Sequence, residues 1–395
     1  MHPIASSPFS AVPGAADSSR IRPLRAAVLS RLLPWFRLHR RALPWRRRRT
    51  PYRVWIAELM LQQTRVDQVV PYYERFMRRF PSLRALARAS RAEVLKAWEG
   101  MGYYARARHM HDAARFIAGP LRGRFPRTPE KLMKLPGIGR YTANAVASLA
   151  FAFDAAVLDG NVIRVLARVL AFDRDVTATS AREELQRVAD RLIVRGRAGE
   201  VNEALMELGA ICCLPRNPAC DRCPLRGVCR ARLAGRPEAY PVKRRRKPVP
   251  HKVVGAGVVI NRRGEILIAQ RKESSMLGGL WEFPGGTRER GESMPECIAR
   301  ELKEELGIST EVGRRLVVVH HAYSHFTIDL HAHWARIVKG RPRAIHCADF
   351  AWTTIRGLRK YAFSAADLAI IEALEKATPS SIPFPWPRAG RPPSC

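Results

Sequence analysis

The 395-residue chain lacks any run of about eighteen apolar residues, the length that a membrane-spanning helix needs. Its longest apolar segment, residues 143–153, is short and is interrupted by Asn144 and Ser148, so we expect a buried core helix. Acidic residues are also scarce, at 35 against 69 lysines and arginines, which gives a formal net charge of +34. This charge implies a polyanionic partner, and without a membrane span we expect that partner to be nucleic acid.

Cysteine is scarce overall, yet five of the eight cysteines lie within residues 212–229. The sequence shows no secretory signal, and this crowding is not typical of a disulfide framework. Four of the five have the spacing C-x6-C-x2-C-x5-C, namely Cys213, Cys220, Cys223 and Cys229. The compact array predicts a structural [4Fe-4S] cluster; the alternative is zinc, which usually pairs its thiolates in two C-x2-C knuckles.

The first two segments of the chain differ sharply in composition. Residues 1–24 are rich in Ser, Pro and Ala and are predicted to be disordered. Their low acid content is similar to that of an organellar transit peptide, but three prolines disfavour the amphipathic helix that such a peptide needs. Residues 25–233 show one short helical pattern after another, with Gly and Pro between them, which predicts an all-α domain.

The pattern changes in the second half. Residues 234–252 combine proline with a Lys/Arg run and predict a linker. Residues 253–377 then show alternating strand and helix signals, which predict an α+β domain. We expect a hairpin of strands at 253–260 and 265–270, further strands at 314–321 and 326–337, and helices at 293–306 and 364–375. Residues 378–395 are rich in proline and are expected to be disordered, and the chain has no internal repeat.

Two acidic residues of the first domain have unusual settings. Glu58 is the one acid in the apolar helical pattern of residues 50–66, and an apolar setting raises the pKa of a carboxyl group. The alternative is that Glu58 is an ordinary helical residue that forms an ion pair with Arg53 or Arg65. Asp159 stands at the start of another helical pattern, which predicts a helix N-cap.

Two further segments have features of nucleic-acid binding. Gly137 and Gly139 in LPGIGRYTAN predict a tight turn that presents backbone N–H groups at a helix N-terminus, where a phosphate can bind. The segment GMGYYARARHMH, residues 100–111, places an aromatic pair beside Arg106 and Arg108. Aromatic rings can fill the gap that a flipped base leaves, and arginines can contact phosphates.

Together these segments resemble the endonuclease III superfamily and, within it, adenine DNA glycosylases of the MutY family. The resemblance rests on the cysteine array, AELMLQQTRV, the glycine turn followed by LDGNVIRVLARV, and GMGYYARAR. It implies that Glu58 protonates the leaving adenine and later assists water, and that Asp159 faces the deoxyribose. Tyr141 stands where the lyase branch has a Schiff-base lysine, so base removal should be monofunctional. Tyr141 is expected to hydrogen-bond Asp159, with Asn161 as a second support.

The same resemblance implies the contacts with DNA. Tyr103 should be the wedge, Gln63 should insert on the other side, and Glu203 should contact the adenine edge. The phosphate contacts should come from Arg106, Arg108, Gly137 and Gly139.

Residues 285–308 match the Nudix box G-x5-E-x7-R-E-U-x-E-E-x-G-U at every fixed position. On a helix, Glu301, Glu304 and Glu305 share one face, so they could hold a Mg²⁺ ion that bridges a diphosphate. A solvated acidic face is the alternative. The resemblance assigns to this domain the recognition of 8-oxoguanine opposite adenine, through a loop with Ser324 and His325. Tyr323 of that loop replaces the phenylalanine of the family.

The sequence therefore predicts two domains: an all-α helix-hairpin-helix glycosylase domain with an iron–sulfur loop at 213–229, then an α+β Nudix-like domain. We expect a monomeric, cytoplasmic enzyme, associated with the nucleoid in a bacterium, that acts on double-stranded DNA. It should remove adenine mispaired with 8-oxoguanine or guanine. The alternatives are a bifunctional glycosylase and lyase, a noncatalytic damage-binding protein, and a dual-function protein whose second domain also hydrolyses oxidised nucleoside triphosphates.

Overall fold

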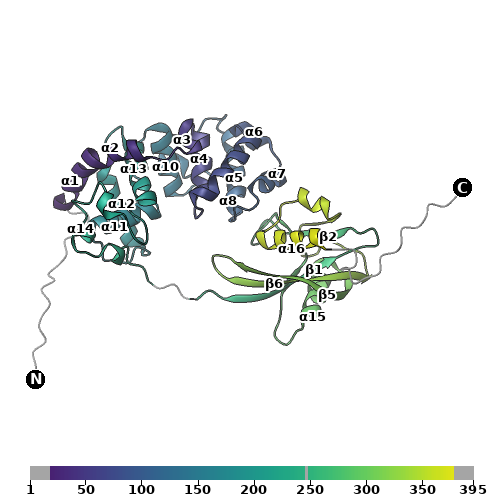
Figure 1. The fold of residues 1–395 in the computed structure, drawn as a ribbon. Coiled ribbons are helices and arrows are strands. Elements are labelled where there is room, and N and C mark those ends of the chain that lie inside the picture. The colour runs from purple at the N-terminus through teal and green to yellow at the C-terminus, as the bar shows by residue number, and fades with distance from the viewer. Residues whose placement is uncertain (1–17, 245–247, 378–395) are drawn as a thin grey trace, which may run out of the picture. The chain divides into compact units, whose positions relative to one another are not determined.

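The computed structural model describes residues 18–244 and 248–377 (Figure 1). The predicted fold class is confirmed, because the first part is helical and the second combines strands with helices. Within the described residues, one compact unit comprises 18–74 and 116–244, and the other comprises 75–115 and 248–377. The borders fall inside two helices, so the second unit contains part of the predicted glycosylase domain as well as the Nudix-like domain.

Short helices joined by tight turns make up residues 18–244. Their bounds are α1 Ser18–Ala27, α2 Leu33–His39, α3 Pro44–Arg47, α4 Pro51–Leu61, α5 Val66–Arg79, α6 Leu83–Arg88, α7 Arg91–Trp98, α8 Ala105–Ala118, α9 Pro129–Leu132, α10 Arg140–Phe151, α11 Gly160–Leu170, α12 Thr179–Leu192, α13 Ala198–Ile211 and α14 Arg230–Leu233, with a π-helical turn at Val28–Leu32 and short 3-10 helices at Cys220–Arg222 and Pro237–Ala239.

Helix α11 is the centre of the first unit. Its apolar face, which includes Val162, Leu166 and Val169, is buried together with apolar side chains of α1, α2, α12 and α13. Burial of side chains of this size contributes about 1.5–3 kcal/mol each relative to exposure. The packing fixes the N-terminus of α11, and with it Asp159 immediately before it.

Two predictions about the ends of this domain are wrong in part. Helix α1 begins at Ser18, so residues 18–24 are helical, because Ile21 and Leu24 are buried in the core. The expected tails at 1–17 and 378–395 lie outside the described residues. The predicted linker is also shorter, because residues 237–242 pack on the first unit: Arg168 Nε donates to the Tyr240 carbonyl at 3.0 Å.

Two sheets form the centre of the Nudix-like domain. One has the strand order β4-β1-β6-β5 and the other β3-β2-β7, with β1 and β6 parallel. The bounds are β1 His251–Val259, β2 Ile266–Gln270, β3 Trp281–Glu282, β4 Gly285–Thr287, α15 Met294–Leu306, β5 Ser309–Ala322, β6 Thr327–Lys339, β7 Asp349–Thr353, a 3-10 helix at Arg356–Lys360 and α16 Ala365–Lys376.

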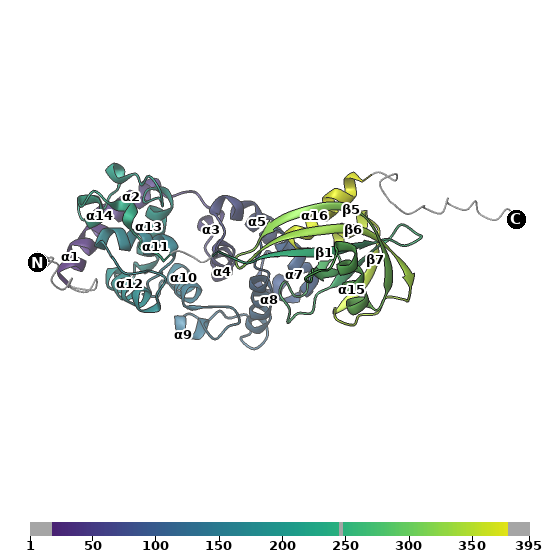
Figure 2. The ribbon, with the colours of Figure 1, turned by 90° about the horizontal axis from the view of Figure 1, so that it is seen from below.

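Helices α15 and α16 cover opposite faces of the four-stranded sheet (Figures 1 and 2). Gly255 and Gly257 of β1 let α15 approach closely, because a Cβ atom on Gly255 would lie 2.7 Å from Ile298. Both helices were predicted from sequence and are confirmed. The predicted hairpin is wrong: β1 and β2 meet in a single bridge between Ile260 and Ile266 and then enter different sheets. The sequence could not show this divergence, because other strands outcompete the local pairing.

Candidate active site

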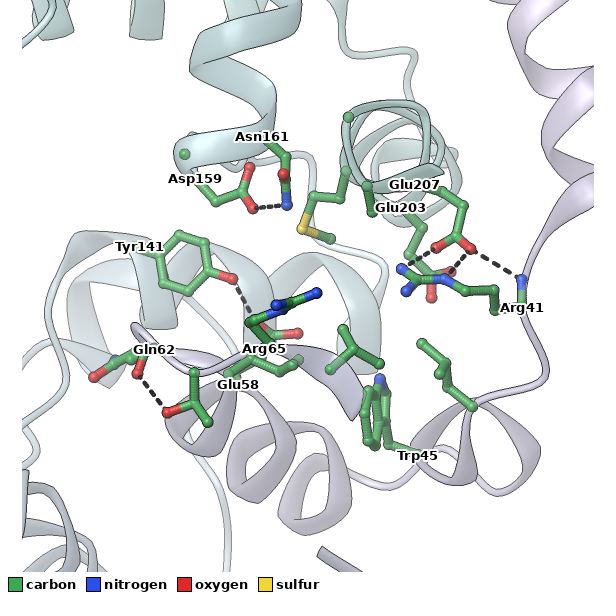
Figure 3. Close-up of a pocket in the computed structure, with 18 of the residues that line it drawn as sticks. Arg41, Trp45, Glu58, Gln62, Arg65, Tyr141, Asp159, Asn161, Glu203 and Glu207 are labelled. Atoms are coloured by element: carbon green, nitrogen blue, oxygen red, sulfur yellow. Dashed lines mark hydrogen bonds and ion pairs between the residues drawn. The ribbon is translucent and has the colours of Figure 1, made fainter. Parts of the chain in front are cut away.

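A pocket of about 810 Å³ lies in the first unit, among α4, α10, α11 and α13 (Figure 3). This volume is within the usual range for sites that hold a small molecule or a nucleoside. The predicted residues that line it are Glu58, Gln63, Tyr141, Asp159, Asn161 and Glu203. The fold thus gathers side chains that are separated by up to 145 positions in the sequence.

Glu58 lies on the buried side of α4, and only 4% of its surface is exposed. Thr50 caps this helix by accepting the Arg53 N–H, and Pro51 follows at the first helical position. Burial raises the pKa of Glu58 to about 7, although the hydrogen bond from Tyr141 opposes the rise. The carboxyl group is therefore poised to hold or release a proton near neutral pH.

Tyr141 makes a different contact from the one expected. Its hydroxyl donates to Glu58 Oε2 at 2.5 Å, whereas a bond to Asp159 was predicted (Figure 3). The reason is position: Tyr141 lies in the first turn of α10, and α10 packs directly against α4. Burial raises the pKa of Tyr141 well above its ordinary value, so the phenol keeps its proton and remains a donor.

Asp159 is the N-cap of α11, as predicted. Its Oδ1 atom accepts the Val162 N–H at 2.7 Å, and Oδ2 accepts Asn161 Nδ2 at 3.0 Å. Burial raises the pKa of Asp159, while these two donors act in the opposite direction. The donors also fix both carboxylate oxygens at the pocket wall, so the carboxylate cannot rotate without losing a hydrogen bond.

Glu203 lies on the pocket side of α13 within an ion-pair network. Its carboxylate pairs with Arg46 at 3.0 Å and with Arg49 at 2.5 Å. Sequence reasoning missed Glu207, one turn further along α13, which pairs with Arg41 at 2.7 Å and with Arg46 at 2.9 Å. Burial alone would raise the pKa of Glu207, but the arginines outweigh burial and lower it.

Two segments close in sequence to pocket residues contain a residue with left-handed backbone, and the glycine turn among them was predicted. Gly137 has a φ of 70°, which favours glycine, and Gly139 is the N-cap of α10. Gln63 follows the end of α4, has a φ of 59° and is exposed. The structure thus confirms the turn between two helices, and phosphate binding at these positions stays a prediction.

Tyr103 lies just before α8 with a φ of 49° and is 40% exposed, so it is not a core residue. The two nearby arginines are half-buried and contact protein atoms. Arg106 stacks 5.1 Å from the Tyr103 ring and donates to the Gly102 carbonyl at 3.3 Å. Arg108 donates to the Gly278 carbonyl at 2.7 Å. Contact of either guanidinium with phosphate stays a prediction.

The loop between β5 and β6 carries the predicted reading residues. His325 is exposed, and Ser324 Oγ donates to the Tyr103 hydroxyl at 3.1 Å. The Tyr323 ring packs between His321 and Phe326, with centroid distances of 4.5 and 4.9 Å. Both predicted recognition elements, the wedge and the loop, thus lie together in the second unit.

The four predicted cysteines border a single cavity beside α11. Described cysteines form no disulfide, so all four sulfurs are available as ligands. Arg168 Nη1 lies 3.3 Å from Cys213 Sγ, and apolar side chains such as Leu225 line the remainder. Four thiolates around one cluster carry excess negative charge, which the Arg168 guanidinium partly offsets, while the apolar wall keeps water away from the cluster. The residues therefore fit an iron–sulfur cluster.

The carboxylates of the Nudix box lie on one side of α15, but Arg300 lies among them. It pairs with Glu301 at 3.0 Å and with Glu304 at 3.4 Å. Glu305 accepts the Gly285 N–H at 3.2 Å, and burial raises its pKa to about 7. The expected convergence is therefore incomplete, because the Arg300 guanidinium pairs with two of the three carboxylates.

Three regions of the chain match known families. Residues 56–191 match the HhH-GPD superfamily base excision DNA repair protein, residues 213–229 match the iron-sulfur binding domain of endonuclease III, and residues 255–373 match the NUDIX domain.

Whole-length relatives decide the family. Adenine DNA glycosylase from Rattus norvegicus is 35% identical, over 87% of this chain and 77% of the relative. The Homo sapiens enzyme is 37% identical, over 79% of this chain and 66% of the relative. The enzyme of Buchnera aphidicola from Schizaphis graminum is 32% identical, over 76% of this chain and 84% of the relative. The chain belongs to the adenine DNA glycosylase family. It is a base excision repair enzyme that acts on N-glycosyl bonds of DNA, and it carries an iron–sulfur cluster.

The glycosylase pocket contains residues that local patterns did not reveal. Trp45 and Arg41 line it from the segment before α4, where the sequence shows only a basic run. Glu207 had one available signal, since it follows Glu203 by four positions in a predicted helix and so shares its face. No helix in the described part of this glycosylase is long and apolar enough to cross a membrane.

Proposed function

We propose that this glycosylase removes adenine mispaired with 8-oxoguanine, and with guanine, and leaves an abasic site in an uncut strand. One observation carries the proposal: Glu58, with a pKa of about 7, and Asp159 share one pocket in which residue 141 is a tyrosine rather than an amine. The partner is double-stranded DNA, and the enzyme acts as a monomer in the cytoplasm, at the nucleoid in a bacterium.

Glu58 acts first as the general acid. At neutral pH a substantial fraction of the group is protonated, so it can donate a proton to a ring nitrogen of the flipped adenine. The Tyr141 hydroxyl occupies Oε2, which leaves Oε1 to face the base. When the base departs, the Glu58 carboxylate can accept a proton from the attacking water, which returns the acid to its starting form.

Asp159 stabilises the sugar as the N-glycosyl bond breaks. Cleavage places positive charge on the deoxyribose, and a fixed carboxylate beside it stabilises the transition state more than the ground state. The donors Val162 N–H and Asn161 Nδ2 hold the carboxylate in place before the reaction begins. No reorganisation is then needed at the moment of bond cleavage.

The cluster ligands are Cys213, Cys220, Cys223 and Cys229, and the group that they would hold is a [4Fe-4S] cluster. When bound, it supplies a covalent crosslink of the loop and takes no part in bond cleavage. Arg168 ties this loop to α11, since it contacts Cys213 and donates to the Leu214 carbonyl at 2.6 Å. The loop therefore supports the helix that begins at Asp159.

The test is strand scission on duplexes with adenine opposite 8-oxoguanine, guanine or thymine, each with and without alkali. We expect cleavage that depends on alkali, fastest opposite 8-oxoguanine and slowest opposite thymine. Scission without alkali, or covalent trapping by borohydride, would identify the lyase alternative. Mismatch binding without any base release would identify the noncatalytic alternative.

A second proposal concerns Mg²⁺ at the Nudix box. Glu301, Glu304 and Glu305 lie on one side of α15, and Glu301 packs closely under the loop, since a Cβ atom on Gly286 would lie 2.2 Å from Glu301 Oε1. These three carboxylates would hold the ion, which would neutralise charge on a bound diphosphate. Calorimetric titration with Mg²⁺, with Glu304→Gln as the control, tests binding. Turnover of 8-oxo-dGTP that vanishes in this variant would establish the dual function.

A further inference from the structure

The turn that carries Tyr103, between α7 and α8, has an unusual backbone. Three of its residues have left-handed φ angles: Gly100 at 86°, Gly102 at 68° and Tyr103 at 49°. Glycine adopts this conformation freely, but tyrosine keeps it only when its surroundings hold it. The Tyr103 ring is 40% exposed, so burial of the ring does not hold it. Other contacts therefore fix the turn.

Two side chains donate to the same backbone oxygen of this turn, the Gly102 carbonyl. Trp98 Nε1, from the last residue of α7, lies 3.0 Å from that oxygen. Arg106 Nη2, from the first turn of α8, lies 3.3 Å from it and also 3.3 Å from the Met101 carbonyl. Because the two donors come from opposite ends of the turn, they join α7 to α8 through the backbone immediately before Tyr103.

The Arg106 guanidinium also packs on two aromatic rings. Its central carbon lies 5.4 Å from the centre of the Trp98 ring and 5.1 Å from the centre of the Tyr103 ring. A cation is attracted to an aromatic face at these distances. Burial lowers the pKa of Arg106 to about 10, so the group stays charged at neutral pH although it is partly removed from water.

The remainder of the turn is buried beneath Tyr103. The side chains of Trp98, Met101 and Tyr104 are all less than 9% exposed. The Tyr104 hydroxyl accepts the Gly100 N–H at 3.1 Å, which adds a bond within the turn. A firmly held base thus presents one exposed aromatic ring, that of Tyr103.

We propose that Arg106 is a positioning residue for base flipping: it holds the turn so that the Tyr103 ring meets the duplex in one orientation. The inference rests on the proposed function and on the predicted wedge role of Tyr103. When the ring enters DNA it can leave Arg106, but the bonds to the two carbonyls persist, because both acceptors belong to the buried turn. A wedge that is held in advance loses less conformational freedom when it enters the duplex.

Direct contact with phosphate is the other role for an arginine at this position, and lysine separates the two roles. Lysine keeps the positive charge, which is what a phosphate contact mainly needs. It lacks the planar group that packs on two rings and the fixed fork of donors. Arg106→Lys should therefore restore a phosphate contact and should not restore the turn.

The test compares Arg106→Lys and Arg106→Met with Arg84→Met, which changes an exposed arginine of α6 in the same unit. The measured quantity is the single-turnover rate of adenine release opposite 8-oxoguanine, with enzyme that saturates the DNA. Both Arg106 variants should lower this rate by about ten- to a hundredfold, the value of a hydrogen bond from a charged donor. Arg84→Met should leave the rate unchanged.

Two further readouts distinguish positioning of the wedge from other roles. The slope of log affinity against log salt should be the same for Arg106→Met as for wild type, whereas loss of a phosphate contact would make it shallower by about one. The fluorescence of 2-aminopurine beside the target adenine should rise less on binding of either Arg106 variant, because the wedge unstacks the bases less well.

Gly102→Ala tests the turn while Arg106 is kept. Apart from its chain neighbours, no heavy atom lies within 4 Å of the added Cβ position, so the change disfavours the left-handed φ without a clash. This variant should also lower the rate of release and the rise in fluorescence. Circular dichroism and thermal unfolding check that each variant is folded, and if Arg106→Met is not, Gly102→Ala decides.

Several outcomes would overturn the proposal. Full activity of Arg106→Lys would show that charge alone is needed, and a shallower salt slope in Arg106→Met would identify a phosphate contact. Normal release and normal fluorescence in Gly102→Ala would show that the conformation of the turn does not matter. If wild type releases no adenine, the proposed function fails, while the fluorescence readout still tests the turn.

Discussion

At the scale of single residues, each proposed catalytic group has its properties set by a few contacts. Glu58 is buried, and it accepts a hydrogen bond from the neutral phenol of Tyr141. Asp159 has two N–H donors. Two carboxyl groups in one pocket thus have different environments, which is the arrangement that separates an acid from a charge stabiliser.

Glu58→Gln should bind a mismatched duplex normally while base release falls by about 10² to 10⁴, because the amide cannot donate or accept the transferred proton. The wild-type single-turnover rate should fall as pH rises above about 7, where Glu58 ionises. Single-turnover excision rates of wild type and Glu58→Gln, measured under enzyme excess across a range of pH, give both the loss in the variant and the pH dependence of wild type. Near wild-type release by the variant would remove Glu58 from the mechanism.

Glu58 should also make stability depend on pH. Its pKa is raised from 4.5 to about 7 in the folded state, so the folded protein favours the protonated form. The free energy of unfolding should therefore fall as pH rises from about 4.5 to 7, by up to roughly 3 kcal/mol. Urea unfolding at pH 5 and pH 8 should show this fall in wild type and a smaller one in Glu58→Gln. An equal fall in wild type and in Glu58→Gln would show that Glu58 does not cause the pH dependence of stability.

Asp159→Asn separates capping from catalysis. Asparagine is as good an N-cap as aspartate, so the midpoint of thermal unfolding should change little. Excision should fall by about 10² to 10³, because the charge beside the sugar is lost. Asp159→Ala is the matched control, which should lose about 1 kcal/mol of stability in addition. A stable, fully active asparagine variant would leave Asp159 with the capping role alone.

At the scale of elements, α11 connects the pocket to the cluster loop. Asp159 caps its N-terminus, and Arg164 and Arg168 on its other turns donate to carbonyls of residues 209–215. The loop therefore stabilises the position of α11, and α11 fixes the position of the Asp159 carboxylate. Loss of the cluster should therefore disturb the position of Asp159 in the pocket.

Cys220→Ser should lose iron and stability together, because cluster ligation and folding of the loop are coupled. The purified wild type should contain about four irons per chain, the content of one [4Fe-4S] cluster. Iron analysis and thermal unfolding of both proteins measure the effect, with the buried Cys297 of α15 as a control cysteine in Cys297→Ser. Stoichiometric zinc without iron in wild type would contradict the cluster.

At the scale of the whole molecule, the net charge of +34 dominates association with DNA. Affinity for any duplex should fall at least about tenfold between 50 and 200 mM salt, because bound counterions are released from phosphate. Fluorescence anisotropy measures this fall. When the enzyme saturates the DNA, the rate of the chemical step should change far less with salt. An affinity that does not depend on salt would show that phosphate contacts are few.

The sequence alone determined the family and the fold class, and it predicted the groups that we propose to carry the chemistry. Those features depend on local spacing: the four cysteines, the Nudix box and the segment around Glu58 have fixed positions along one stretch of chain. The N-cap role of Asp159 was readable for the same reason, since a cap acts within three residues of itself.

Only the tertiary structure decided which distant side chains meet. It assigned Tyr141 to Glu58 rather than Asp159, bound Arg108 to the Gly278 carbonyl, and placed the predicted wedge and reading loop in one unit. The reason is physical: these contacts depend on how helices pack and where chains cross. Hydrophobic patterns specify that an element has a buried face, and they carry no information on which partner covers it.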